Sequence, residues 1–458
     1  MNRNSVLKHI KDSQFKRVCE FAVAEMKRMK IPGSVVGVYY KGKEFVAGFG
    51  KTSVEHPLPV TPETLFQIGS NTKPMVATVV MQLVESGALD LDTPIVKYLP
   101  KFTLKDKYTA KHVTMRHLLT HTAGWEGDYF NDFGWGDDAL SKLVASMTRL
   151  NQMTPVGEIW SYNNAAFYVA GLIIEKLTGK SFEAAMQAMI FDPLGMNMSC
   201  FFPDDRIMTA RYAVGHDLVK RRNRVSRPWS LSRAEGPAGG VLAPARDLLA
   251  FARFHMGDGS VDGKRVLEPA SIRLMQQPVV AATGLWQMGL SWFLSEVDGM
   301  KIVQHGGATN GQHSGLWLIP EKGFALTWLT NSSETRTEVL FDKALEVYFD
   351  ASLPKPALLD LPPETWDTFT GKYENIESIL TLSRKKNKAW LSFEHKGGFP
   401  TPDSPPMPVP PPVRIGFYEQ DKVIVLDEPL KNQRGEFLRA SDGSLAWFRF
   451  GSRIHKKI

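Results

Sequence analysis

Several features that would mark a specialised class of protein are missing from this sequence. Only two cysteines, Cys19 and Cys200, occur among 458 residues, and they neither form a C-x-x-C pair nor suffice for a disulfide framework. No stretch is apolar over the length of a membrane-spanning helix, and the N-terminal residues lack the continuous apolar segment of a secretory signal. We therefore expect an intracellular, cytoplasmic protein with no membrane partner, provided that no leader precedes these residues.

A strong excess of one charge is also missing. Lysine and arginine number 55 against 48 aspartates and glutamates, and the difference of +7 is spread along the chain. Short basic runs at residues 220–222 and 384–386 are typical of solvated surfaces, and no nucleic-acid-binding motif accompanies them. No G-x-S-x-G nucleophile elbow occurs, which disfavours the α/β-hydrolase class. We expect no nucleic-acid partner.

The hydrophobic pattern predicts an α+β fold. Helical spacing is seen at about residues 13–30, 72–87, 165–177, 182–190, 247–256 and 334–349, and strand-like runs at 35–40, 44–48, 303–305, 315–319 and 324–329. Because strands stand at both ends of this region, we expect the ends to pair in one antiparallel sheet flanked by helices. The middle would form a mostly helical subdomain, with residues 204–236 as an irregular surface lid or loop.

Proline-rich residues 352–364 predict a linker after this first domain. Beyond it, seven short strand candidates with regular turns predict a small antiparallel barrel or sandwich. They lie at residues 371–373, 379–382, 389–393, 415–418, 423–426, 436–438 and 445–450, and residues 400–412 are expected to be an extended loop. The sequence thus predicts a domain at residues 1–351, a linker at 352–364 and an all-β domain at 365–458.

A serine and a lysine one helical turn apart are the first candidates for chemistry. Ser70 and Lys73 share a face at the start of an apolar helix, and a desolvated lysine can take the proton from a serine hydroxyl. The S-x-x-K pattern occurs five times, but the other four copies lie in polar, basic or proline-containing stretches. The alternative is a helix-capping serine beside a solvated lysine.

Two further motifs gain meaning from their order and surroundings. Tyr162-Asn163-Asn164 fits Y-x-N, and His305-Gly306-Gly307 fits H-x-G where a K-T-G would stand, although each pattern also occurs elsewhere. With their flanks, and with residues 116–124 and 236–241, they resemble blocks of the class C β-lactamase-like serine hydrolases, in that family's order. Residues 434–437 and 442–449 more weakly resemble the appended β-barrel of some D-aminopeptidase and esterase relatives.

The resemblance implies an acyl-enzyme mechanism. Ser70 would attack a carbonyl group, and Lys73 with Tyr162 would remove its proton and later protonate the leaving group. A tyrosine suits this role only if nearby cations lower its pKa from about 10. Asn164 would orient Lys73 and the substrate amide.

The resemblance also implies how the substrate is held. Backbone N–H groups of Ser70 and Ala308 would form the oxyanion hole. Gly306 and Gly307 would let the substrate approach their strand closely. A lysine in place of His305 would bind a substrate carboxylate and help to lower the tyrosine pKa, whereas a histidine is mostly neutral at pH 7.

No metal or cofactor is expected. His117 and His121 are four residues apart, which can suit a metal on a helix, but no glutamate lies between them and no third ligand is evident. We interpret them as a packed, hydrogen-bonded pair near a helix end.

The leading hypothesis is therefore a serine hydrolase of small-molecule esters or small amides. His305 favours such substrates over penicillins. The alternatives are a peptidase acting on D-amino-acid or peptidoglycan-type peptides, or a weak β-lactamase. A non-catalytic sensor or scaffold is disfavoured, because binding alone would not require Ser70, Lys73, Tyr162 and Asn164 together.

Overall fold

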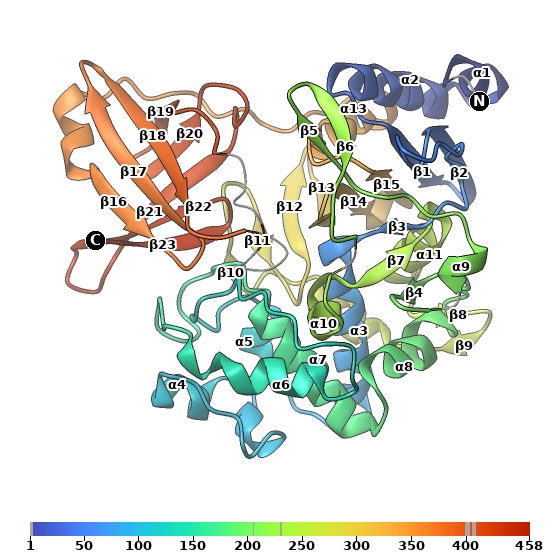
Figure 1. Ribbon diagram of the computed structural model, residues 1–458, viewed down its shortest axis with the longest axis horizontal. Coiled ribbons are helices and arrows are strands. Elements are labelled where there is room, and N and C mark those ends of the chain that lie inside the picture. Colours follow the sequence, from blue (N-terminus) through green and yellow to red (C-terminus); the bar gives the residue numbers. More distant parts are fainter. Residues whose placement is uncertain (1–2, 205, 230, 399–403, 405–408) are drawn as a thin grey trace.

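An eight-stranded antiparallel sheet joins the two ends of the first 350 residues (Figure 1). The computed structural model describes residues 3–204, 206–229, 231–398, 404 and 409–458. The strand order is β10-β11-β12-β13-β14-β15-β1-β2. Its members are β1 (Gly33–Tyr40), β2 (Lys43–Gly50), β10 (Val280–Ala281), β11 (Gln287–Met288), β12 (Phe293–Val297), β13 (Met300–Thr309), β14 (Gln312–Ile319) and β15 (Phe324–Thr330). The predicted pairing of the two ends is confirmed, because β1 runs antiparallel to β15 with Val36 opposite Trp328.

The N-terminal helices and a late helix cover one face of this sheet. They are α1 (Arg3–His9), α2 (Ser13–Arg28) and α13 (Glu338–Phe349). Asp12 caps α2 by accepting the Phe15 N–H, and the apolar stripe of α2 is buried, as its period predicts. On the sheet side, Trp317 of β14 stacks on Phe341 of α13 with ring centroids 5.2 Å apart. Between these helices and the sheet, the buried hydrophobic residues form one apolar cluster.

The other face carries the helical subdomain. Its helices are α3 (Thr72–Glu85), α4 (Lys107–His112), α5 (Met115–Leu119), α6 (Ala139–Ser146), α7 (Ala165–Thr178), α8 (Phe182–Met186), α9 (Arg206–Thr209), α10 (Gly236–Gly239), α11 (Ala245–Met256) and α12 (Pro269–Met275). Residues of α3 are buried nearly all round, and those of α7 almost as completely, which explains their continuous apolar composition. These two helices pack together and bring the segments that precede them into one place.

Part of the predicted irregular lid is in fact a short hairpin. Strands β5 (His216–Val219) and β6 (Arg222–Val225) pair antiparallel, while positions 205 and 230 lie outside the described residues. The turn between them is made by Lys220 and Arg221, both at positive φ (48° and 64°). Such turns usually contain Asn-Gly or Asp-Gly, so the sequence carried no hairpin signal here.

The C-terminal residues form a closed antiparallel barrel. Its strands are β16 (Gly371–Glu374), β17 (Ser378–Lys385), β18 (Lys388–His395), β19 (Val413–Glu419), β20 (Lys422–Val425), β21 (Arg434–Arg439), β22 (Leu445–Phe450) and β23 (Arg453–Lys457). Phe437 stacks on Phe448 in its core. The sequence did not predict β23, which closes the barrel against β16. Of the expected loop at 400–412, positions 400–403 and 405–408 lie outside the described residues.

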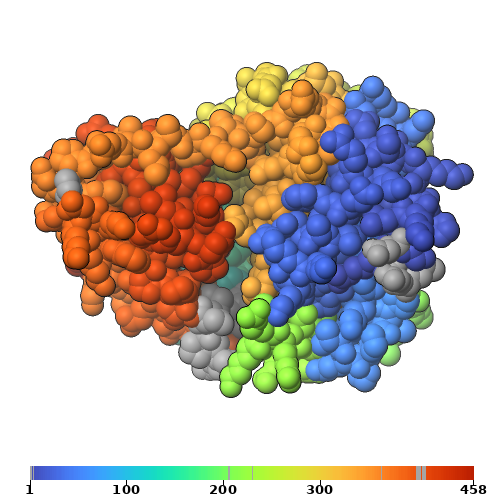
Figure 2. All heavy atoms as spheres, turned by 90° about the horizontal axis from the view of Figure 1, so that it is seen from above, coloured from blue at the N-terminus to red at the C-terminus, as the bar shows by residue number. Residues whose placement is uncertain are grey.

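The barrel packs against the side of the first domain (Figure 2). The contact includes a hydrogen bond from the Trp447 indole N–H to the Met153 carbonyl (2.9 Å) and one from Arg449 to the Trp160 carbonyl (3.0 Å). The Tyr162 N–H donates to the Ser452 carbonyl at 2.9 Å. The turn between β22 and β23 therefore touches a segment that the sequence predicts to be catalytic.

Within the described ranges, no helix combines the length and apolarity needed to cross a membrane.

Candidate active site

Ser70 lies in a single 3₁₀ turn, η1 (Gly69–Asn71), that leads directly into α3. Gly69 has a φ of +52°, and a Cβ there would lie 2.7 Å from the Ala308 backbone nitrogen. Both the positive φ and the close approach require glycine. The turn thus places Ser70 beside β13, where the predicted oxyanion-hole residue Ala308 lies.

Lys73 is completely buried and hydrogen-bonded on three sides. Its Nζ lies 2.9 Å from Ser70 Oγ, 2.7 Å from Asn164 Oδ1 and 2.6 Å from the Ala238 carbonyl oxygen. Burial lowers the pKa of Lys73 well below its ordinary value; the charge of Arg453 adds to this and that of Asp128 opposes it. A neutral amine has two N–H groups for the two carbonyl-type oxygens and a lone pair for the Ser70 hydroxyl.

Tyr162 is buried beside this pair. The Arg453 guanidinium lies 4.7 Å from its ring centroid, and Lys73 Nζ 4.9 Å from it. Burial nevertheless raises the pKa of Tyr162 well above its ordinary value, against the smaller opposing effects of a hydrogen bond with Ser70 and the Arg453 charge. The expected lowering of this pKa by nearby cations does not occur, because desolvation outweighs the Arg453 charge and the Ser70 hydrogen bond. Tyr162 keeps its proton at neutral pH.

His305 supplies no positive charge. It is buried on β13 next to Phe293, and burial lowers its pKa to about 3. Its Nδ1–H donates to the Gly306 carbonyl at 2.5 Å, and within the described structure its Nε2 has no hydrogen-bond partner. A neutral imidazole therefore stands where a lysine would provide a cation.

The two glycines after His305 differ in what surrounds them. A Cβ on Gly307 would lie 1.9 Å from the Ile68 carbonyl oxygen, whereas one on Gly306 would meet nothing closer than the Ser314 carbonyl at 3.7 Å. Gly307 therefore lets β13 pack against the segment that precedes Ser70. This packing reason was not visible in the sequence.

The structure also brings in two residues that sequence reasoning missed, Asp128 and Arg453. Asp128 lies on the loop between α5 and α6, and its side chain is 2% exposed. It receives hydrogen bonds from Asn164 Nδ2 (2.6 Å) and from the Arg453 guanidinium (2.6 and 3.0 Å). Asp128 was one of several acids in a polar loop and Arg453 one of many basic residues, so only the fold identifies this pair.

His117 and His121 do not form the expected pair. His117 Nδ1 accepts the Thr114 N–H at 3.2 Å, and His121 Nδ1 accepts the Asn163 N–H at 2.9 Å. Burial lowers the pKa of both histidines. Among the residues that the structure describes, no group of three or more His, Cys, Asp or Glu side chains could hold a metal ion.

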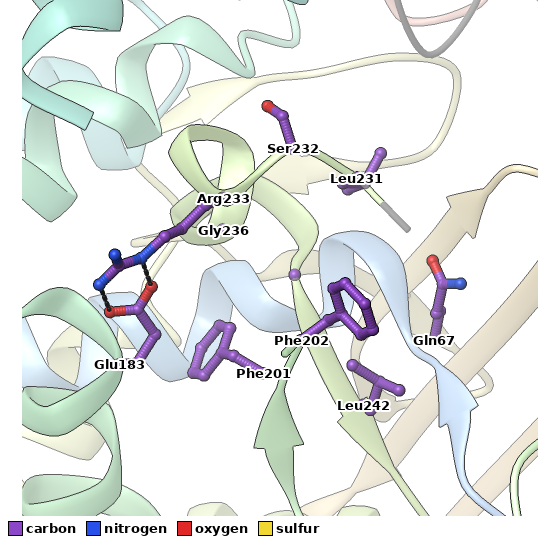
Figure 3. Close-up of a pocket in the computed structure, with 10 residues that line it drawn as sticks. Gln67, Glu183, Phe201, Phe202, Leu231, Ser232, Arg233, Gly236 and Leu242 are labelled. Atoms are coloured by element: carbon purple, nitrogen blue, oxygen red, sulfur yellow. Dashed lines mark hydrogen bonds and ion pairs between the residues drawn. The ribbon is translucent and has the colours of Figure 1, made fainter. Parts of the chain in front are cut away.

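A small pocket lies next to the site (Figure 3). Phe201, Phe202, Leu231 and Leu242 form its apolar walls, and Arg233 and Glu183 pair at 2.8 Å on its rim. Residues 236–240 separate the pocket from Lys73, since Gly236 and Gly240 line it while the Ala238 carbonyl accepts the Lys73 hydrogen bond.

The sheet, the helical subdomain and the hydrogen-bonded pair of Ser70 and the buried Lys73 define a fold of the serine β-lactamase and penicillin-binding-protein type. The Beta-lactamase family model matches residues 21–348, and the chain belongs to this family. The resemblance found in the sequence is thereby confirmed.

Known proteins are similar to this chain over different shares of its length. Penicillin-binding protein 4 of Amycolatopsis lactamdurans is 36% identical over 363 residues, covering 75% of this chain and 93% of that protein. Unguisins hydrolase ungD' of Aspergillus campestris is 25% identical over 415 residues, covering 85% of this chain and 72% of that protein. The crystal structure of SurE with D-Leu has a TM-score of 0.77 at 25% identity and covers 97% of this chain and all of SurE. This last similarity includes the barrel.

Proposed function

We propose that the protein hydrolyses a small-molecule amide or ester through an acyl-enzyme formed at Ser70, with Lys73 as the base. The observation that carries this proposal is the surroundings of Lys73, which is buried within 2.9 Å of the Ser70 hydroxyl. Its lowered pKa favours the neutral amine, and its other two contacts are acceptors that occupy the two N–H groups. A lysine held this way has its lone pair free for the serine proton.

In the proposed reaction, Ser70 Oγ bonds to the substrate carbonyl carbon while its proton passes to Lys73 Nζ. The N–H groups of Ser70 and Ala308 stabilise the oxyanion. Tyr162, which keeps its proton in the free site, protonates the leaving nitrogen or oxygen and regains a proton from Lys73. Water then attacks the acyl-enzyme by the same route in reverse, giving a carboxylic acid and restoring Ser70.

Mass spectrometry of the intact protein tests the nucleophile. A fluorophosphonate probe, and a mixed panel of esters, amides and β-lactams, should add one acyl or phosphonyl mass to the wild type. Ser70→Ala should abolish the adduct and turnover. Ser383→Ala is the matched control, because Ser383 begins another S-x-x-K pattern on strand β17 and should keep full labelling. Persistent turnover in Ser70→Ala would overturn the proposal.

A second candidate, a peptidase acting on D-amino-acid peptides, is favoured by one observation. The structure of SurE that covers 97% of this chain, barrel included, holds D-Leu. Matched dipeptides and amino-acid amides that differ only in the chirality of one residue test this candidate. A tenfold or greater preference in kcat/KM for the D form would support it. Hydrolysis of esters with no peptide turnover would reject it and leave the first proposal standing.

A further inference from the structure

Four polar side chains form a continuous line from the barrel to the candidate nucleophile. Arg453, the first residue of β23, makes two hydrogen bonds to Asp128 at 2.6 and 3.0 Å. Asp128 accepts the Asn164 amide N–H at 2.6 Å, and Asn164 Oδ1 accepts from Lys73 at 2.7 Å. Lys73 in turn reaches Ser70 Oγ. The line crosses from the C-terminal barrel into the helical subdomain.

The chemistry of these groups fixes the direction of every hydrogen bond. A guanidinium only donates and an ionised carboxylate only accepts, so Asp128 must face the N–H₂ end of the Asn164 amide. The amide oxygen then points at Lys73 and takes one of its N–H groups. If Asp128 carried a proton, it could donate to Asn164 and turn the amide round, which would aim N–H groups at the lysine. An ionised Asp128 is therefore needed for the arrangement at Lys73.

We propose that Arg453, which belongs to the barrel, is a positioning residue that keeps Asp128 ionised and Lys73 unprotonated. The barrel thereby makes Lys73 able to act as the base. This inference rests on the proposed role of Lys73 as base. Asp128 is almost fully buried, and a buried carboxylate without a cation takes up a proton or holds one on a neighbouring amine. The Arg453 side chain is 29% exposed, and it reaches the buried carboxylate from the rim of the site.

The direction of the pKa shifts agrees with this geometry. Burial would raise the pKa of Asp128, but the charge and hydrogen bonds of Arg453, together with Asn164, hold it below its ordinary value. The same Arg453 charge helps to lower the pKa of Lys73. Removing one positive charge from this cluster therefore raises its affinity for a proton, whether that proton resides on Lys73 or on Asp128.

Other titratable groups face this cluster. Glu377, between β16 and β17, hydrogen-bonds Asp128, and burial and the Asp128 charge raise its pKa to about 8. A protonated Glu377 can donate that bond. Burial lowers the pKa of His455 on β23 to about 4, and the neutral histidines on the other side have been described above. At neutral pH, Arg453 is therefore the permanent positive charge of the cluster.

The test is the pH profile of kcat/KM in the full chain. In Arg453→Gln, the acidic limb of this profile should shift to higher pH by about one unit or more. The value of kcat/KM should then fall about tenfold near neutral pH and recover in alkaline buffer. Arg453→Lys, which keeps the charge, should lie between Arg453→Gln and the wild type. Asp128→Asn removes the opposing charge and should move the limb down, while the N–H groups it introduces can turn the Asn164 amide round and lower the maximum of kcat/KM. The double variant Asp128→Asn/Arg453→Gln should return it towards the wild-type position.

Two matched controls separate this role from docking of the barrel. Arg449 comes from the adjacent strand and binds the Trp160 carbonyl, but it does not contact Asp128. Arg449→Gln should disturb the same interface and leave the acidic limb in place. Glu377→Gln keeps a donor for Asp128 without its titration and should also leave the limb in place.

Three results would overturn the inference. The first is an acidic limb that stays in place in Arg453→Gln. The second is a double variant whose limb lies no nearer to the wild-type position than that of Arg453→Gln. The third is a shift in Arg449→Gln as large as that in Arg453→Gln. If Arg453→Gln does not fold, the sign of the Asp128→Asn shift decides instead, since an upward or absent shift contradicts the proposal. If Ser70→Ala loses fluorophosphonate labelling and the other variants keep it, the proposal that Ser70 is the nucleophile stands even when the inference about Arg453 fails.

Discussion

The imidazole of His121 stacks on the phenol ring of Tyr162, with ring centroids 4.3 Å apart and planes 26° apart. Because His121 Nδ1 accepts the Asn163 N–H, this ring is neutral and fixed by the backbone of the Tyr162 segment itself. The stack therefore holds the tyrosine in one plane, with its hydroxyl at Ser70, and adds no charge. A protonated, immobile phenol suits a proton donor to a leaving group.

Tyr162→Phe should therefore harm some substrates far more than others. For an amide, whose leaving nitrogen needs a proton, we expect kcat to fall about a hundredfold or more. For a 4-nitrophenyl ester of the same acid, whose leaving oxygen is already stable as an anion, the loss should stay within about tenfold. Steady-state kinetics on this matched pair checks the prediction, and equal losses on both substrates would contradict it.

Lys73→Met should abolish rapid acylation while the site keeps its shape. Methionine has nearly the length of lysine without the amine, so the Ser70 proton has no acceptor and the acylation rate should fall at least about a hundredfold. Because burial lowers the pKa of Lys73 well below its ordinary value, the wild type should acylate at full rate in mildly alkaline buffer. Stopped-flow measurement of the acylation burst checks both statements. A wild-type burst in the variant would remove Lys73 from the mechanism.

Gly307→Ala should destabilise the fold, whereas Gly306→Ala should not. The new Cβ at position 307 would lie 1.9 Å from the Ile68 carbonyl oxygen, a backbone atom that cannot move without displacing the Ser70 turn. We expect the free energy of unfolding to fall by about 2 kcal/mol or more. At position 306 the nearest atom is 3.7 Å away, and the change should stay within about 1 kcal/mol. Urea unfolding of the two variants makes the comparison, and similar losses would refute it.

His255 lies outside the candidate site and should lower the stability of the fold at acidic pH. It is buried on α11, its Nε2 lies 3.0 Å from Thr78 Oγ1, and burial lowers its pKa to about 3. Between its unfolded pKa near 6.5 and this value, only the unfolded chain binds the proton, so stability falls as the pH falls.

His255→Gln keeps a donor to Thr78 but does not titrate. From pH 7 to about pH 5, its free energy of unfolding should therefore fall by about 2 kcal/mol less than that of the wild type. Urea titrations at the two pH values measure this difference. Equal slopes would mean that His255 is protonated in the folded state.

The sequence predicted those features that depend on neighbouring residues. Apolar periodicity located α3 and α7, and the spacing of Ser70 and Lys73 placed them on one turn. Features that depend on the tertiary fold were not predictable. The direction of the Tyr162 pKa shift follows from burial, which exceeds the opposing effects of the Ser70 hydrogen bond and the Arg453 charge. Arg453 lies on a short strand rich in cations, which gives no strong β signal and no hint of its acidic partner.

The late position of β23 has a consequence for the newly made chain. Asp128 and Arg453 are 325 residues apart, so at ordinary rates of protein synthesis the acid leaves the ribosome on the order of half a minute before its partner. During that interval the helical subdomain can fold around Ser70 and Lys73, but Asp128 has no arginine. On the arrangement proposed above, a nascent or prematurely ended chain holds an extra proton on Lys73 or on Asp128. Reactivity would then appear only after the barrel has closed.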